Sequence, residues 1–107
     1  MNEIEYQECV ESTIEAIEDA VDESGQDIDC ELNGGVLTLT CANSSVIIFS
    51  RQIATKELWM AAKSGGYHFF YDEKVGQWCC SRSGESLSAL LAKVTTEQAG
   101  AAVMLPS

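Results

Sequence analysis

Twelve of the 17 acidic residues in this 107-residue chain lie within residues 1–31, and the first basic residue is Arg51. Exposed carboxylates suit hard cations that prefer oxygen ligands, and residue type alone does not choose among calcium, magnesium, manganese and iron. An open surface imposes no coordination geometry, so we expect weak, multiple and poorly selective cation binding. The candidate metal ligands are Glu15, Glu18, Asp19, Asp22, Glu23, Asp27 and Asp29.

These carboxylates conflict with two rules of helix stability. Side chains three or four residues apart are neighbours on a helix, and each like-charged pair, such as Glu15–Asp19, costs roughly 0.2–0.5 kcal/mol. The C-terminal end of a helix favours Lys or Arg, yet this one carries Asp22 and Glu23. A solvated face that provides solubility is the simpler interpretation, but it leaves both conflicts unexplained. We therefore favour a site for a cation or for a basic patch on a partner protein.

The overall charge restricts the class of partner. A protein with a formal net charge of -11 repels nucleic acids and anionic membranes, because both are negatively charged. No apolar run approaches the roughly 18 to 20 residues that cross a bilayer. The acidic start MNEIEYQECVES also lacks the basic region of a secretory signal or transit peptide. We expect a cytoplasmic protein that binds neither nucleic acid nor membrane.

Signals for catalysis and for redox chemistry are sparse. His68 is the only histidine, and a lone histidine on a strand is more often a surface residue than a catalytic base. Without another histidine, no Ser–His–Asp or Cys–His arrangement can be argued from the sequence. The five cysteines are odd in number and show no C-x-x-C spacing, which predicts neither a disulfide framework nor a zinc site. We expect reduced thiols that pack as small hydrophobic groups.

Apolar residues at helical spacing predict a helix near each end of the chain. The first helix should cover residues 3–23, and Gly25 is a plausible stop. Its apolar stripe is Tyr6, Val10, Ile14, Ile17 and Val21. The second helix should run from about residue 85 to 98, with Ser83 or Gly84 as its N-cap. Its stripe is Leu87, Leu90, Leu91 and Val94.

Between the helices the hydrophobic period changes to two, which predicts up to six short strands with tight turns such as Asn33-Gly34-Gly35. The expected strands are 27–32, 36–41, 46–52, 57–62, 67–71 and 77–82. The economical fold is α+β: a two-layer sandwich with the N- and C-terminal helices packed on one face of a five- to six-stranded antiparallel sheet. We expect one domain over residues 1–107, with the apolar tail 101–107 packed on the helices.

Strand alternation assigns side chains to the two faces of this sheet. It points Ile28, Cys30 and Leu32 inward and Asp27, Asp29 and Glu31 outward. It also points Leu58 and Met60 inward, and it sends Trp59, His68, Phe70, Ile48 and Ser50 outward. Trp78 should belong to the core. An outward Trp beside apolar groups predicts a contact surface; the alternative is an opposite parity that buries Trp59.

Three segments, DIDCELNGGVLTL, LWMAAKSGGYHF and WCCSRSGESL, resemble the bacterial frataxin (CyaY) family, and the likeness extends in order along nearly the whole chain. This resemblance implies a role in iron–sulfur cluster assembly, with iron, ferrous or ferric, bound weakly along the first helix and first strand. It places the acidic ridge on Glu18, Asp19, Asp22, Glu23, Asp27 and Asp29, and the exposed sheet tryptophan on Trp59.

The resemblance also implies two partners, the cysteine desulfurase and the scaffold protein on which clusters form. The expected partner-binding residues are Glu18, Asp19, Asp22, Glu31, Ser50, Gln52, Trp59 and His68; Ser50 departs from the family, where an Asn is usual. Three functions remain open: a regulator of the desulfurase that senses iron, an iron donor or store, and a ferroxidase. We expect the first, in a protein that is not an enzyme and is a monomer, with oligomers formed in the presence of iron.

Overall fold

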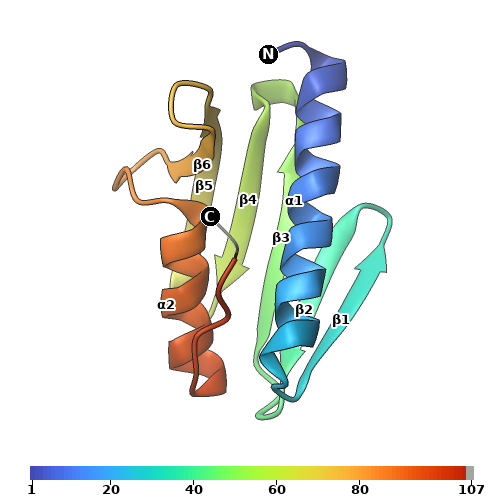
Figure 1. The fold of residues 1–107 in the computed structure, drawn as a ribbon, viewed down its shortest axis with the longest axis vertical. Coiled ribbons are helices and arrows are strands. Elements are labelled where there is room, and N and C mark those ends of the chain that lie inside the picture. Colours follow the sequence, from blue (N-terminus) through green and yellow to red (C-terminus); the bar gives the residue numbers. More distant parts are fainter. Residues whose placement is uncertain (106–107) are drawn as a thin grey trace.

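The computed structural model describes residues 1–105, which form a six-stranded sheet with two helices over one of its faces (Figure 1). The chain starts with a long helix, continues through six consecutive strands and returns to a second helix. The elements are α1 (Glu3–Ser24), β1 (Ile28–Asn33), β2 (Val36–Cys41), β3 (Val46–Gln52), the 3₁₀ turn η1 (Ile53–Thr55), β4 (Glu57–Ala62), β5 (Gly65–Asp72), β6 (Gln77–Cys80) and α2 (Leu87–Ala99).

Helix α1 forms where the apolar stripe predicts it. All five stripe residues are buried, together with Ala20. Asn2 caps the first turn: its side chain accepts a hydrogen bond from the Glu5 backbone, and the Glu5 side chain accepts one from the Asn2 backbone. Gly25 ends the helix with a φ of 68°, a conformation that glycine adopts without steric cost. The last turn contains no basic residue.

The sheet is an antiparallel meander in which strand order follows chain order from β1 to β6. Each strand pairs with the next through a short connection. In the β1–β2 hairpin, Gly34 and Gly35 both have positive φ, as a tight two-residue hairpin turn requires. The expected antiparallel sheet is therefore confirmed, with all six strands present.

Helix α2 begins later than expected, and the predicted caps Ser83 and Gly84 are wrong. Ser86 is the N-cap, and its hydroxyl accepts a hydrogen bond from the Ala89 backbone at 3.1 Å. The helix cannot start earlier because Glu85 and Ser86 still pair with the end of β6, through the Cys80 N–H to Glu85 O bond of 2.7 Å and a Cys79–Ser86 bridge. Gly100 closes α2 with a φ of 86°.

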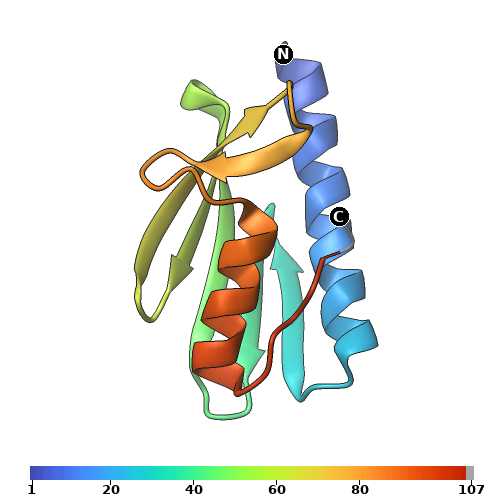
Figure 2. The same cartoon turned by 60° about the vertical axis from the view of Figure 1, so that its left-hand side comes forward.

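The core lies between the helices and the sheet. It contains Tyr6 and Ile17 from α1, Phe49 and Phe69 from the sheet, and Leu91 from α2, all fully buried. The expected packing of the tail is confirmed at Val103, which is also fully buried and donates its N–H to Thr95 Oγ1 at 2.9 Å. Figure 2 shows the tail running back between the helices. Pro106 and Ser107, which belong to the same predicted segment, lie outside the described residues.

Strand β1 corrects one expectation. Cys30 and Leu32 pair with the buried Leu39 and Leu37, so they lie on the helix side of the sheet as predicted. Both are nevertheless exposed, Leu32 to 51%, because β1 is the edge strand and extends beyond the cover that α1 provides.

Within residues 1–105, neither helix is long and apolar enough to span a membrane.

Candidate functional site

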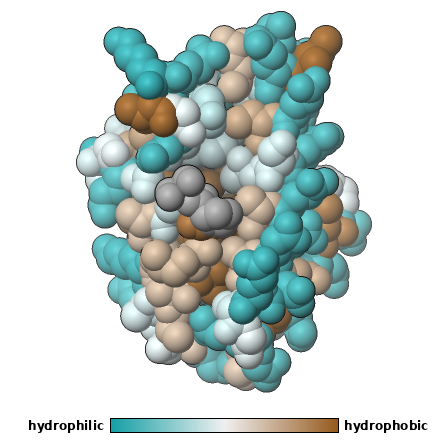
Figure 3. All heavy atoms as spheres, in the orientation of Figure 1, coloured by the Kyte–Doolittle hydropathy of each residue, from teal (hydrophilic) through white to brown (hydrophobic). Residues whose placement is uncertain are grey.

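The acidic ridge consists of Glu15, Glu18, Asp19, Asp22, Glu23, Asp27 and Asp29, and it begins on the solvent side of α1. Helical spacing places its first five members beside the buried stripe, and all of them are exposed except Glu18, which is half-buried. Figure 3 shows a hydrophilic band that follows α1 along the molecule. The last turn of α1 therefore presents carboxylates at the negative end of the helix dipole.

The ridge continues across Gly25 onto β1. Asp27 precedes the strand, and Asp29 and Glu31 project from the face of β1 opposite Cys30. Cys30 is exposed as a residue, but partial desolvation of its sulfur raises the pKa of the thiol, and the nearby carboxylates of Glu18, Asp29 and Asp22 raise it further. Carboxylates of the helix and of the strand both act on this thiol, so the two halves of the ridge lie close to each other at Cys30.

The ridge carboxylates lack cationic partners within residues 1–105. The one ion pair in this range joins the N-terminal amine of Met1 to Glu73, at 3.6 Å and remote from the ridge. No three His, Cys, Asp or Glu side chains in the described part of the chain converge to hold a metal ion. The oxygen donors fit a hard cation in type, but their open arrangement provides no closed coordination shell.

The open face of the sheet carries a second candidate surface, the aromatic patch, made of Ser50, Gln52, Trp59 and His68. Ser50 pairs with Trp59, and Trp59 pairs with His68, so these three side chains form a row across β3, β4 and β5. The Trp59 and His68 rings stack with centroids 4.1 Å apart and planes 9° apart. The predicted outward direction of Trp59 is confirmed, although the stack leaves this residue half-buried.

Sequence reasoning missed Glu57. Its Oε1 accepts hydrogen bonds from Trp59 Nε1 at 3.0 Å and from Thr55 Oγ1 at 2.9 Å. It also pairs with Phe70, which is 42% exposed on the same face. The i, i+2 spacing of Glu57 and Trp59 on one strand was the signal that could have linked them.

The predicted partner-binding residues separate into two groups. Glu18, Asp19 and Asp22 lie on α1, in the helix layer, whereas the aromatic patch lies on the opposite face of the sheet. Glu31 connects them: it projects from the edge strand β1 onto the open face, where it pairs with Thr38, and Thr38 pairs with Ile48. A partner that contacts both groups must therefore wrap around the β1 edge.

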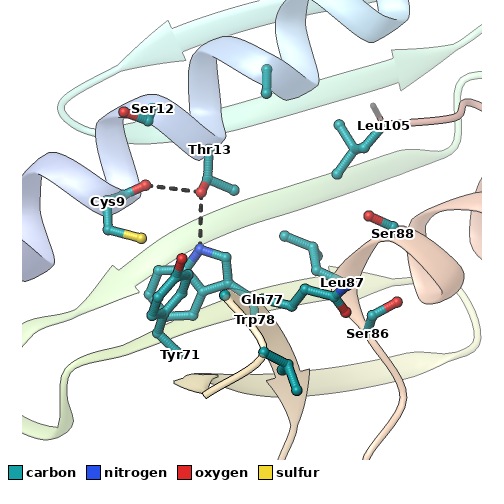
Figure 4. A pocket seen from close by; sticks show the side chains of 13 residues that line it. Cys9, Ser12, Thr13, Tyr71, Gln77, Trp78, Ser86, Leu87, Ser88 and Leu105 are labelled. Atoms are coloured by element: carbon teal, nitrogen blue, oxygen red, sulfur yellow. Dashed lines mark hydrogen bonds between the residues drawn. The ribbon is translucent and has the colours of Figure 1, made fainter. Parts of the chain in front are cut away.

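A cavity of about 360 Å³ opens between α1, β6 and the start of α2 (Figure 4). Trp78 forms part of its wall, and the Trp78 Nε1–H donates to Thr13 Oγ1 at 2.9 Å. Thr13 Oγ1 in turn donates to the Cys9 carbonyl oxygen at 2.8 Å. The Thr13 hydroxyl therefore already donates one hydrogen bond and accepts another. These two bonds hold β6 against α1, which is a structural role rather than a ligand-binding one.

Comparison with known proteins gives consistent results. The sequence matches the family model for the frataxin-like domain over residues 1–101. It is 48% identical over 101 residues to the iron-sulfur cluster assembly protein CyaY of Ectopseudomonas mendocina, and 50% identical over 101 residues to the protein of the same name from Pseudomonas syringae pv. tomato. Each comparison covers 94% of this chain and 92% of the relative.

Solved structures share the fold. Frataxin from Psychromonas ingrahamii superposes with a TM-score of 0.91 at 30% identity, over 100% of both chains. A trimeric frataxin from the yeast Saccharomyces cerevisiae, described as complexed with ferrous, gives a TM-score of 0.73 at 23% identity over 86% of each chain, a likeness in fold alone. The helix–sheet–helix sandwich expected from the sequence is confirmed.

Proposed function

The chain belongs to the frataxin-like family, and from this premise we propose that it regulates iron–sulfur cluster assembly by binding the cysteine desulfurase in an iron-sensitive manner. Its relatives at 48% and 50% identity are named iron-sulfur cluster assembly proteins, which supports a role in that process. The desulfurase as partner, iron as ligand and the regulatory mechanism are our own steps beyond those names.

The observation that carries the proposal is the acidic ridge. Its Asp22 and Glu23 carboxylates lie at the C-terminal end of α1, where the helix dipole disfavours negative charge. No ridge carboxylate has an ion-pair partner within residues 1–105. The resulting repulsion lowers stability, and either bound cations or a basic protein surface would relieve it. Long-range attraction between this ridge and a basic patch accelerates encounter with the desulfurase and weakens as salt screens it.

Iron binding follows from the same carboxylates. Ferrous and ferric ions accept oxygen ligands, and the ridge offers many of them without a converging set of three in the described residues. We therefore propose weak binding at several overlapping positions along Glu18, Asp19, Asp22 and the start of β1. Bound iron would compete with the basic partner for the same charges, which couples iron level to desulfurase binding.

The aromatic patch provides the short-range contact. Trp59 is held by the His68 stack and by the Glu57 hydrogen bond, so it presents a fixed ring on the open sheet face. Such an ordered aromatic residue contributes to binding with little further loss of side-chain freedom. We propose that the patch contacts the scaffold protein or the adjoining desulfurase surface, while the ridge contacts the desulfurase.

Cluster-assembly kinetics on a scaffold, with and without this protein and at several iron concentrations, test the proposal. A regulator inhibits or modulates the desulfurase in proportion to its own concentration, and iron changes the extent of that effect. A variant with Glu18, Asp19 and Asp22 replaced by Gln, Asn and Asn should lose the effect. Assembly rates that are the same with and without the protein would contradict a regulatory role.

The alternative is an iron donor or store, which weak carboxylate binding also favours. A donor would transfer prebound iron to the scaffold faster than free iron reaches it, without changing desulfurase turnover.

Catalysis is a weaker candidate, because a ferroxidase needs a defined redox site and the ridge has no converging ligand set in residues 1–105. Multiple-turnover iron oxidation would establish that third function.

A further inference from the structure

A second cavity, of about 430 Å³, is lined by no residue of the acidic ridge. It opens between the β4–β5 turn, β5, the turn after β6 and one face of α2. Its volume is within the range that small-molecule sites occupy. The residues that give it its character are Ser64, His68, Cys80, Arg82, Glu85 and Lys93.

The charge of this cavity departs from that of the protein. The chain has six basic residues against 17 acidic ones. Among the described residues that line the cavity, however, Arg82 and Lys93 are basic and only Glu85 is acidic. Neither cation forms an ion pair within residues 1–105. Both therefore remain available to a ligand, and Arg82 offers the planar fork that matches carboxylate and phosphate groups.

The turn after β6 brings polar backbone groups close to the same cavity. Gly84 closes this turn through its N–H bond to the Cys80 carbonyl, at 2.9 Å. Burial raises the pKa of the Cys80 thiol and so does the nearby Glu85 carboxylate, but hydrogen bonds from the Ser83 and Arg82 backbones and from the Ser83 hydroxyl lower it on balance. These donors face the Cys80 sulfur, so they add positive partial charge beside the cavity rather than free hydrogen-bond donors.

We propose that this cavity binds a small organic or inorganic oxyanion, a phosphate or a carboxylate, held between Arg82 and Lys93. Arg82 would bind two ligand oxygens, Lys93 would contribute a point charge from α2, and the hydroxyls of Ser64 and Ser83 would donate hydrogen bonds. Leu90 provides an apolar floor for a short carbon chain. This site is separate from the ridge and from iron, and it stands whether or not the regulatory function is correct.

His68 belongs to both the cavity and the aromatic patch: it lines the cavity, while its ring stacks on Trp59 on the open face of the sheet. An oxyanion beside His68 would change the electrostatic environment of the Trp59 indole. Trp78 does not line this cavity, and its indole N–H donates to Thr13 on α1. The two indole N–H signals of the protein therefore provide an internal comparison.

The test is a titration of metal-free, ¹⁵N-labelled protein with inorganic phosphate and, separately, with succinate, at constant ionic strength set by sodium chloride. We expect the amides of Ser81–Glu85 and Gly65–Gly66 and the Trp59 indole N–H to shift and saturate, while the Trp78 indole N–H stays still. The relative Kd values of phosphate and succinate identify which oxyanion the site prefers. Arg82→Gln and Lys93→Gln should each raise the Kd about tenfold or more, the effect of removing a hydrogen bond to a charged group.

Lys74→Gln is the matched control, because Lys74 is an exposed cation on the β5–β6 turn that does not line this cavity. It should leave the Kd unchanged. The proposal is overturned if neither anion shifts the cavity amides, if the shifts survive in both Arg82→Gln and Lys93→Gln, or if Lys74→Gln weakens binding equally. Shifts at Trp78 instead of Trp59 would place the ligand in the other cavity and would also overturn it.

Discussion

The indole ring of Trp59 lies flat on the imidazole ring of His68, with centroids 4.1 Å apart and planes inclined by 9°. The pairing of β4 with β5 places the two residues opposite each other, and the Glu57 carboxylate holds the indole N–H from two residues away. An aromatic residue ordered in this way is suited to contact a partner, because binding restricts little additional motion.

Replacing Trp59 by Ala should weaken binding to the partner by about 1–3 kcal/mol if Trp59 is a hot spot. The fold should persist, because the side chain points away from the core and leaves no buried cavity. Isothermal titration measures the first effect and circular dichroism the second. Phe70→Ala, on the same face but outside the Ser50–Trp59–His68 row, serves as the control and should cost less. An unfolded Trp59→Ala protein would contradict the structure.

Replacing Thr13 by Val should destabilise the protein by about 1–3 kcal/mol, because the buried Trp78 Nε1–H loses its acceptor while side-chain volume is kept. Urea denaturation measures the loss. Thr96→Val is a suitable control, because Thr96 is exposed and its hydroxyl bonds only to the Ala92 carbonyl of its own helix. Equal stabilities of the two variants would show that the Thr13–Trp78 bond contributes nothing.

Cations should stabilise the protein through the acidic ridge. Sites of low affinity that exist only in the folded state should add roughly 1 kcal/mol or less at millimolar calcium or ferrous ion, and sodium chloride should act in the same direction by screening. Thermal melting with and without each ion measures this. Replacing Glu18, Asp19 and Asp22 by Gln, Asn and Asn should raise the melting temperature and reduce the response. A melting temperature that no ion changes would contradict the interpretation of the ridge.

The Cys30 thiol should report the state of the ridge. Partial desolvation of the sulfur and the carboxylates of Glu18, Asp29 and Asp22 raise its pKa, so less reactive thiolate is present at a given pH. Glu18→Gln and Asp22→Asn should each lower that pKa and speed alkylation of Cys30, as should added calcium. Mass spectrometry after iodoacetamide treatment at several pH values follows this site, and Glu11→Gln is the control. Unchanged rates in both variants would contradict the clustering of these charges around Cys30.

The sequence predicted the helices, the strands and the direction of Trp59 because each depends on local periodicity. Tyr6 and Val10 repeat at helical spacing, and Leu58, Trp59 and Met60 alternate across a strand, so their faces follow from geometry alone. The position of the ridge on α1 and β1 follows in the same way, since its residues occupy the positions that the buried stripe leaves free.

Other features depend on tertiary contacts that periodicity does not contain. Leu32 alternates like a buried residue, but it is exposed because β1 is an edge strand. Ser86 rather than Ser83 caps α2 because the preceding residues pair with β6. The stack of Trp59 on His68 required the β4–β5 register, which the turn at Lys63-Ser64 sets. The second cavity, which Arg82 and Lys93 line, exists because α2 packs beside the turn after β6.

The most direct test of the central claim is the Kd between this protein and the cysteine desulfurase, measured at low and high ionic strength for two matched variants. The first neutralises Glu18, Asp19 and Asp22 on the ridge. The second neutralises Glu73, Glu85 and Glu97, three exposed carboxylates away from it, and changes the net charge by the same amount.

Exposed ion pairs contribute up to about 1 kcal/mol each, so the ridge variant should bind about tenfold or more weakly and lose most of its salt dependence. The second variant should bind like the unmodified protein. If both variants bind alike, or if the ridge variant keeps full affinity and full salt dependence, the acidic ridge is not the desulfurase-binding surface and the proposed function is wrong.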